Sequence, residues 1–129
     1  MKDIKKSKIR ELKTYLSAYS GTIPFAFLFG SYAKGRQTPL SDIDIALYYK
    51  GLSDKTKFRI ERELSMLFDE QVNILSLEDE DISFSLKLEA VQGIPIMINN
   101  PDFLNRFILR IIHRAEEEKI IIGRLRRVA

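Results

Sequence analysis

Cysteine and tryptophan are absent from this chain, and none of its apolar runs is long. Without cysteine, disulfides and thiolate metal centres are excluded, and the redox compartment is not revealed. No apolar stretch approaches the roughly 20 residues that span a bilayer. The lysines near the N-terminus are not followed by the apolar segment of a signal peptide, so we expect a cytoplasmic protein that makes no membrane contact.

The remaining composition is that of an ordinary globular protein. The 129 residues are 45% hydrophobic and 30% charged, and a chain of this length buries about two-thirds of its unfolded surface, enough for a core. We therefore expect one domain over residues 1–129. The net charge of +3 hides a basic excess at both ends. That excess suits an acidic partner or nucleic acid, or simply the solvated faces of two terminal helices.

Hydrophobic periodicity and turn residues predict helices and strands along the whole chain. Ser53 and Asn100 suit the N-cap position, because their side chains can accept a hydrogen bond from the first helical turn. The expected helices cover 3–18, 54–68 and 101–122, and the last could continue beyond Gly123; the expected strands cover 25–29, 42–49, 71–75 and 94–98.

The segment after residue 77 fits two kinds of structure. Residues 82–88 alternate between apolar and polar side chains, which is a strand pattern. The acidic cluster at 78–81 suits the first turn of a helix, where the dipole favours negative charge. Ile82, Leu86 and Ala90 also lie at helical spacing, and we predict a helix.

The stretch after the strand 25–29 has the composition of a phosphate-binding turn. Gly30 and Gly35 allow the backbone to take positive φ and to approach a phosphate closely. Ser31 is expected at the start of a short helix, where free N–H groups and the helix dipole favour an anion. The sequence therefore predicts an anion cradle between two strands.

Two aspartates open the next predicted strand. Asp42 and Asp44 are two residues apart, so their side chains project from one face, about 7 Å apart at the backbone, while Ile43 and Ile45 turn into the core. Paired carboxylates repel each other unless a cation lies between them, and Mg²⁺ is usually held by one or two carboxylates plus substrate phosphates. A phosphate cradle followed by such a pair indicates phosphoryl or nucleotidyl transfer. The alternative is a tight turn with two acids on an exposed sheet face.

The spacing of these residues resembles a known signature. Gly30-Ser31, three residues, Gly35, five residues and Ser41-Asp42-Ile43-Asp44 are similar to the motif of DNA polymerase beta-like nucleotidyltransferases, and most of all to the minimal nucleotidyltransferases, the MNT family. The resemblance implies an α+β (α/β-like) fold, a small mixed β-sheet with flanking helices, including a helix after residue 81. It also implies Mg²⁺-dependent transfer of AMP from ATP. The implied partner is a HEPN-domain toxin, whose ribonuclease would be silenced by modification of a side chain, most simply a tyrosine.

The resemblance also assigns roles to individual residues. Asp42 and Asp44 would be catalytic and would hold the Mg²⁺. Ser31 would hydrogen-bond the β and γ phosphates, and Lys34 or Arg36 would neutralise charge on the departing pyrophosphate. The nucleotide-binding set would comprise Gly30, Ser31, Lys34, Gly35, Arg36 and Ser41.

One position departs from the family pattern. Relatives place a third catalytic carboxylate on the strand after the long helix, where this chain has Asn73. The third acid helps to hold a second metal and accepts the proton of the attacking hydroxyl. Asparagine can coordinate weakly but cannot act as a base, so a two-metal clamp should be weakened. The chain could be a weak or single-metal enzyme, a binding-only descendant, or a protein inactivated by a deliberate change at Asn73.

Three functions are therefore open. The first is an AMP-transferring antitoxin, and the second is a binding module that neutralises its partner by covering it. The third is a small-molecule nucleotidyltransferase of the aminoglycoside type, which the short chain disfavours because it leaves no room for a separate acceptor domain. A nucleic-acid polymerase is less suitable still, because nothing resembles a template-binding region.

The last predicted helix has more apolar surface than a small core can use. A broad stripe from Phe103 to Ala115 is extended by Ile120, Ile121 and Ile122. Exposed apolar patches often mark a protein partner. This helix is therefore a candidate surface for a partner or for a homo-oligomer, unless it simply wraps across the sheet.

Overall fold

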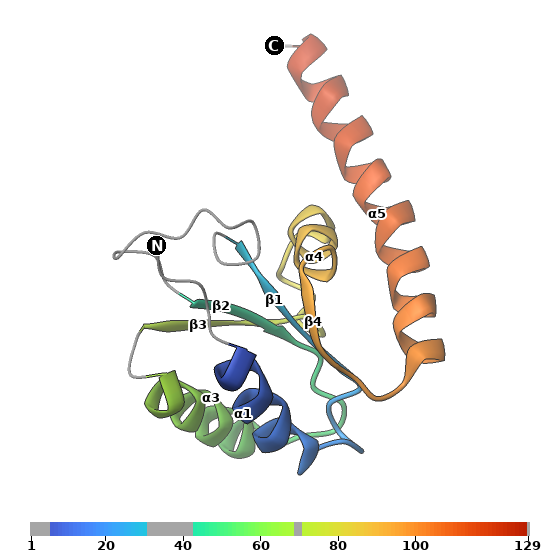
Figure 1. Ribbon diagram of the computed structural model, residues 1–129. Helices are drawn as coiled ribbons and strands as arrows, with labels where there is room; N and C mark the ends of the chain where they lie inside the picture. The colour runs from blue at the N-terminus through green and yellow to red at the C-terminus, as the bar shows by residue number, and fades with distance from the viewer. Residues whose placement is uncertain (1–5, 31–42, 69–70, 129) are drawn as a thin grey trace.

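The computed structural model describes residues 6–30, 43–68 and 71–128, and the side chains of 8–30, 43–68 and 71–118. Helices and strands are interspersed along the chain, as the periodicity predicts (Figure 1). The elements are α1 (Lys6–Ser17), β1 (Phe25–Phe29), β2 (Ile43–Leu47), α3 (Asp54–Phe68), β3 (Val72–Ser76), α4 (Phe84–Val91), β4 (Ile94–Ile98) and α5 (Pro101–Val128).

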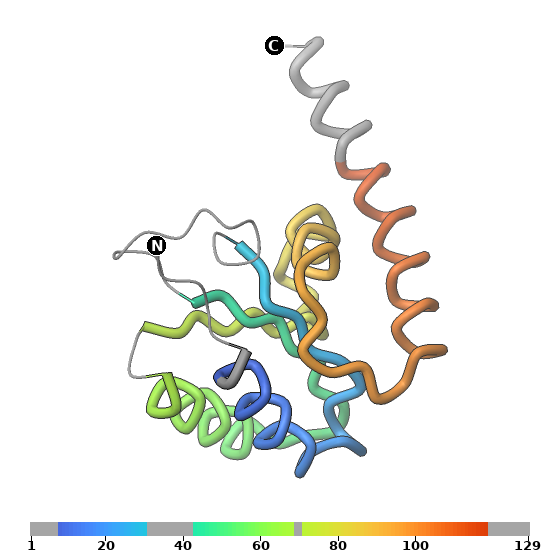
Figure 2. The backbone as a smooth tube through the Cα atoms, viewed as in Figure 1, coloured from blue at the N-terminus to red at the C-terminus, as the bar shows by residue number. Residues whose placement is uncertain are grey.

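The four strands form one mixed sheet in the order β3-β2-β1-β4. β1 is antiparallel to both β2 and β4, whereas β2 and β3 run parallel. As a result, β1 ends where β2 and β3 begin, and these three strand ends lie at the same end of the sheet (Figure 2). β3 is an edge strand, so one side of its backbone is not paired with any other described strand.

Helices cover both faces of the sheet (Figure 1). On one face, Leu12 and Leu16 of α1 and Leu64 of α3 join a buried cluster with alternate residues of the strands. On the other face, Ala90 of α4 and Phe107 of α5 belong to a second buried cluster, which includes Phe25, Phe27 and Ala46 of the sheet. The central strands β1 and β2 are therefore largely buried on both sides, which is why they are mostly apolar, whereas the edge strands β3 and β4 are partly exposed.

The α+β architecture is confirmed, and so is the helix at α4, although a strand pattern overlaps it. The helix forms there because Ser83 caps the segment: its side chain accepts a hydrogen bond from Leu86 N at 3.2 Å. The caps at Ser53 and Asn100 also form, accepting from Thr56 N and Phe103 N respectively. α5 continues past Gly123, to Val128.

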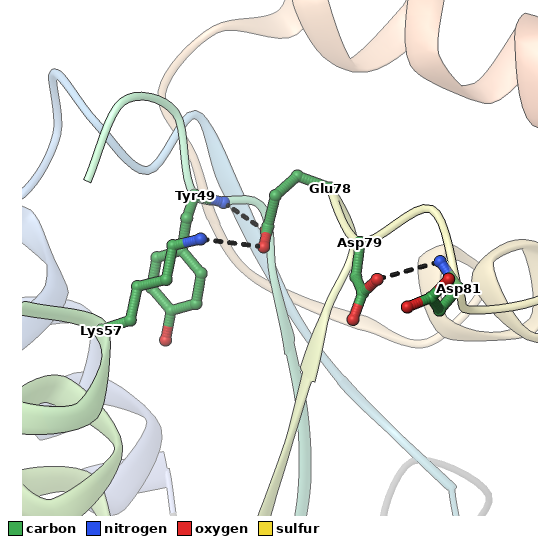
Figure 3. A network of polar contacts seen from close by, with 5 residues as sticks. All are labelled: Tyr49, Lys57, Glu78, Asp79 and Asp81. Carbon is green, nitrogen blue, oxygen red and sulfur yellow. Dashed lines mark hydrogen bonds and ion pairs between the residues drawn. The ribbon is translucent and has the colours of Figure 1, made fainter. Parts of the chain in front are cut away.

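The expected place of the acidic cluster is wrong. Residues 78–81 precede α4 instead of forming its first turn, which carries no acidic side chain. Glu78 instead accepts a hydrogen bond from Tyr49 N at 2.9 Å and pairs with Lys57 at 3.4 Å, while Asp79 accepts from Asp81 N at 2.9 Å (Figure 3). These acids stabilise the turn after β3 and tie it to the end of β2 and the start of α3.

Within the described parts of the chain, none of the helices combines the length and the apolar character that crossing a membrane requires.

Candidate active site at one end of the sheet

The backbone at the end of β1 takes an unusual conformation. Gly30 follows the last residue of the strand and has φ of +72°, a region that favours glycine because it has no Cβ. The backbone at residue 30 therefore has the positive φ for which the sequence predicts a glycine. The remaining residues of the predicted phosphate turn lie outside the described residues.

Asp44 lies directly against this turn. In the sheet register it is opposite Phe29 of β1, the residue before Gly30. A Cβ placed on residue 30 would overlap Asp44 Oδ2 and would lie 3.2 Å from Asp44 Cγ. The absence of a side chain at Gly30 is thus what makes room for the carboxylate, which is half-buried.

Asn73 lies on the other side of Asp44. The two residues are paired in the parallel register of β2 and β3, and Asn73 Nδ2 donates a hydrogen bond to Asp44 Oδ1 at 3.3 Å. The amide turns its nitrogen toward the carboxylate because two facing oxygens would repel each other. Asn73 therefore lies beside Asp44 as a hydrogen-bond donor.

The strand parity at this end is also as predicted. Ile43 and Ile45 are buried, at 2% and 0% exposure, on the face that α1 and α3 cover. Asp44 and Asn73 point to the opposite face, where Ala46 is buried under α4 and α5. The carboxylate is therefore presented at the end of a rigid, fully packed strand.

A divalent cation fits Asp44 in part. A carboxylate oxygen is a suitable ligand for Mg²⁺, but the Asn73 amide competes for a lone pair of the same carboxylate. Among residues 8–30, 43–68 and 71–118, no three acidic, histidine or cysteine side chains come together around a possible metal position. Asp44 is thus the one member of the predicted metal-binding aspartate pair that the structure describes, and a pair of ions would need further negative charge beside it.

Three of the predicted site residues are described, and they lie together. Gly30, Asp44 and Asn73 come together at one end of the sheet, in the order β1, β2, β3. The other predicted binding and metal-ligating residues lie outside the described residues; they are Ser31, Lys34, Gly35, Arg36, Ser41 and Asp42.

A hollow next to Asn73 was not expected from the sequence. It has a volume of about 440 Å³ and lies between α3 and β3, with Phe58, Glu61 and Arg62 on the helix side and Val72 and Asn73 on the strand side. Burial and the nearby negative charge of Glu78 raise the pKa of Glu61, while Lys57 acts in the opposite direction. The available sequence signal was Phe58, an apolar residue that lies off the core-facing stripe of its helix.

Comparison with known proteins agrees with this arrangement. The family described as polymerase beta, nucleotidyltransferase matches residues 10–102. A chain of the crystal structure of a toxin-antitoxin with AMP-PNP is 24% identical with a TM-score of 0.70, and the match covers 95% of this chain and 98% of that chain. A chain of the tri-AMPylated Shewanella oneidensis HEPN toxin in complex with MNT antitoxin is 20% identical with a TM-score of 0.69 and the same coverage.

A third structure, of a putative minimal nucleotidyltransferase, is 24% identical with a TM-score of 0.54, and covers 66% of this chain and 85% of that one. No curated protein matches the chain. At these levels of identity the solved structures show that the fold is shared, while the family match covers most of the chain.

Proposed function

Because this chain belongs to the polymerase beta nucleotidyltransferase family, we propose that it transfers AMP from ATP to a hydroxyl group of a HEPN-family ribonuclease toxin, most simply a tyrosine, and so acts as the antitoxin. The observation that carries the proposal is the Asp44 carboxylate held against the positive-φ backbone of Gly30. Two solved structures of the same fold support the substrate and the partner, since one contains AMP-PNP and the other an AMPylated HEPN toxin.

The proposed reaction is an in-line displacement. The acceptor oxygen forms a bond to the α-phosphorus, the bond between that phosphorus and the bridging oxygen of pyrophosphate breaks, and pyrophosphate leaves. The backbone that begins at Gly30, together with Ser31 and Gly35, would bind the phosphates through N–H and hydroxyl donors. Lys34 and Arg36 would stabilise the departing pyrophosphate, and Ser41 would complete the nucleotide-binding set.

Asp44, with Asp42, would hold Mg²⁺. When bound there, the ion supplies positive charge that neutralises the phosphate oxygens and orients them. The contribution of this chain is to fix Asp44 on a packed strand, so that the carboxylate is held in place before the substrate arrives.

Asn73 limits the rate in this account. Its amide cannot take the proton of the acceptor hydroxyl, so that proton is released to solvent. Its hydrogen bond to Asp44 also holds the carboxylate in one orientation. We therefore expect slower transfer than from a site with a carboxylate at residue 73.

The Asn73–Asp44 hydrogen bond also favours a second candidate function. A neutral amide bound to Asp44, the described member of the predicted aspartate pair, is what a descendant that only binds its partner would tolerate. In that case the chain would neutralise the toxin by covering its surface, without transferring a nucleotide. The two functions share the partner and differ in whether Asp44 is required.

Two further expectations belong to this proposal. The protein would act in the cytoplasm, where ATP and the toxin's RNA substrate are found. α5 would carry part of a contact with the partner or with a second copy of the chain, because Leu109 is 68% exposed and Ile112 38% exposed on it.

The test is transfer of label from α-labelled ATP to the proposed HEPN-family partner. Asp44→Ala should abolish labelling, because it removes the carboxylate that holds the metal, while circular dichroism stays unchanged. Asp81→Ala is the matched control, since it removes an exposed aspartate far from the site, and it should label normally. Labelling by Asp44→Ala at the rate of the control would disprove the proposed role of Asp44. Toxin neutralisation that survives Asp44→Ala without any labelling would establish the binding function instead.

A further inference from the structure

The outward face of α3 combines positive charge with large apolar side chains. At 100° per residue, Lys55, Phe58, Arg59, Arg62 and Met66 fall within an arc of about 100° on the helix. All five are exposed, Phe58 by 67% and Met66 by 74%. Solvent-facing helix positions seldom carry two such apolar side chains next to three cations, so this face is a candidate binding surface.

Two of the three acids of α3 lie away from this face, and the third, Asp54, is an exposed residue of the first turn next to it. Glu63 turns toward α1, where its carboxylate accepts a hydrogen bond from the Tyr15 hydroxyl. Glu61 lines the hollow beside β3. Lys55, Arg59 and Arg62 are exposed and make no ion pair with any described residue.

α3 is also held firmly against the sheet. Lys57 points inward from its first turns, lies over the Tyr49 ring at 5.4 Å and pairs with Glu78 at 3.4 Å (Figure 3). Ile60 and Leu64 are fully buried beneath the helix. The outward face is therefore a fixed surface, and a partner that binds it is positioned relative to the sheet.

The hollow lies at the edge of the sheet, next to the strand that carries Asn73. Phe58 and Arg62 belong both to the outward face and to the lining of the hollow. Asn73 also lines the hollow, but its side chain lies on the opposite face of the sheet, where it donates a hydrogen bond to Asp44, so a bound segment reaches that site by passing around the edge of β3. The strand side of the hollow is the edge strand β3, whose outer backbone groups are not paired with another described strand. Edge groups of this kind can hydrogen-bond an incoming peptide.

The strand order indicates which reactant would approach the site from the β3 edge of the sheet. The phosphate turn begins at Gly30 after β1, Asp44 is on β2, and Asn73 is on β3. In an in-line displacement the attacking and leaving oxygens lie on opposite sides of the phosphorus. In the proposed reaction, with pyrophosphate over β1 and the α-phosphorus near Asp44, an attacking hydroxyl in line with them would approach on the β3 side.

We propose that the outward face of α3 binds an acidic segment of the acceptor protein, with an apolar side chain seated against Phe58 at the hollow, and that the acceptor passes around the edge of β3 to bring its hydroxyl to Asn73 and Asp44. This inference rests on the proposed AMP transfer for its direction of approach. The charge of the face selects an acidic occupant. A protein segment is favoured over RNA because Phe58 and Met66 offer apolar contacts and β3 offers peptide groups.

The test compares two charge reversals on exposed helix faces. Arg59→Glu/Arg62→Glu changes the proposed face, and Arg10→Glu/Lys13→Glu on α1 makes the same change in charge at the same spacing. Binding of the cognate HEPN-family protein is measured without ATP, and KM and kcat for the protein acceptor are measured with ATP. The first variant should weaken binding and raise KM by about tenfold or more with kcat nearly unchanged, while the second should have little effect. Phe58→Ser, at an exposed position, serves as a second variant with the same expectation if the double reversal does not fold.

Equal binding by the two charge-reversal variants would overturn the inference, and because that binding is measured without ATP, the result does not depend on transfer. Wild-type protein that binds the partner but never labels it would instead overturn the proposed function. Loss of binding to a mixed-sequence RNA by Arg59→Glu/Arg62→Glu, with unchanged binding to the protein, would show that the face recognises nucleic acid and would also overturn the inference.

Discussion

At the scale of single residues, the site depends on what lies on either side of Asp44. Gly30 leaves space for one carboxylate oxygen, and Asn73 donates a hydrogen bond to the other. The sequence alone predicts what each of the three residues can do: glycine allows a positive φ, aspartate can bind a metal, and asparagine cannot act as a base. Their contact could be inferred only from the resemblance to a known motif, since the register that joins them comes from pairing of strands far apart in the chain.

The space at Gly30 gives the first prediction at this scale. Gly30→Ala should lower the free energy of unfolding by about 1–2 kcal/mol for the left-handed backbone, and by a further amount for the overlap with Asp44. When Asp44 is already alanine the overlap disappears, so in that background Gly30→Ala should cost only the backbone contribution. Urea denaturation of the two single variants and the double variant measures this coupling. Strict additivity would show that the two residues do not compete for the same space.

At the scale of elements, sequence periodicity succeeds where one face of a helix or strand is buried. The stripe of Ile60 and Leu64 predicts α3, and the alternation around Asp44 predicts β2 and its parity. Sequence periodicity fails at residues 78–81, because Glu78 there accepts a hydrogen bond from Tyr49 N and pairs with Lys57, two groups that are distant from it in sequence. The hollow beside β3 was missed for the same reason: it exists only when α3 and the edge strand are brought together.

The packing of α4 gives a prediction of pH dependence. Lys87 is only 4% exposed and lies 5.0 Å from the Phe84 ring. Burial lowers the pKa of Lys87, and Arg110 adds to this, whereas Asp79, Glu78 and Glu80 oppose it. The folded protein therefore binds this proton less tightly than the unfolded chain, so the cost of the buried charge is largest at neutral pH. That cost falls as the pH rises toward the ordinary lysine pKa of about 10.4.

Lys87→Met should therefore raise the free energy of unfolding at pH 7, and its advantage over the wild type should shrink as the pH approaches 10. Lys50→Met is the matched control, because Lys50 also lies over an aromatic ring, that of Phe103 at 5.1 Å, but is exposed. Chemical denaturation across this pH range measures both. An advantage of Lys87→Met that stayed constant with pH would mean that the charge of Lys87 is not what costs stability.

At the scale of the whole molecule, the sheet separates two tasks. One end of it collects Gly30, Asp44 and Asn73, while the flanking α3 presents a basic and apolar surface next to its edge. The family match covers this whole unit, from α1 to the start of α5. The net charge of +3 does not predict where a partner binds, because the exposed cations of α3 lie in the acidic middle of the sequence.

The central claim is that this chain is a nucleotidyltransferase whose rate is limited by asparagine at the position beside Asp44. The most direct measurement is the initial rate of AMP transfer to the cognate HEPN-family protein, with the wild type and Asn73→Asp compared over a range of Mg²⁺ concentrations. We expect a low rate for the wild type and a higher one for Asn73→Asp, with a steeper dependence on Mg²⁺, because the added carboxylate supplies a base and charge for a second ion. A rate for Asn73→Asp that equals or falls below that of the wild type would contradict the account.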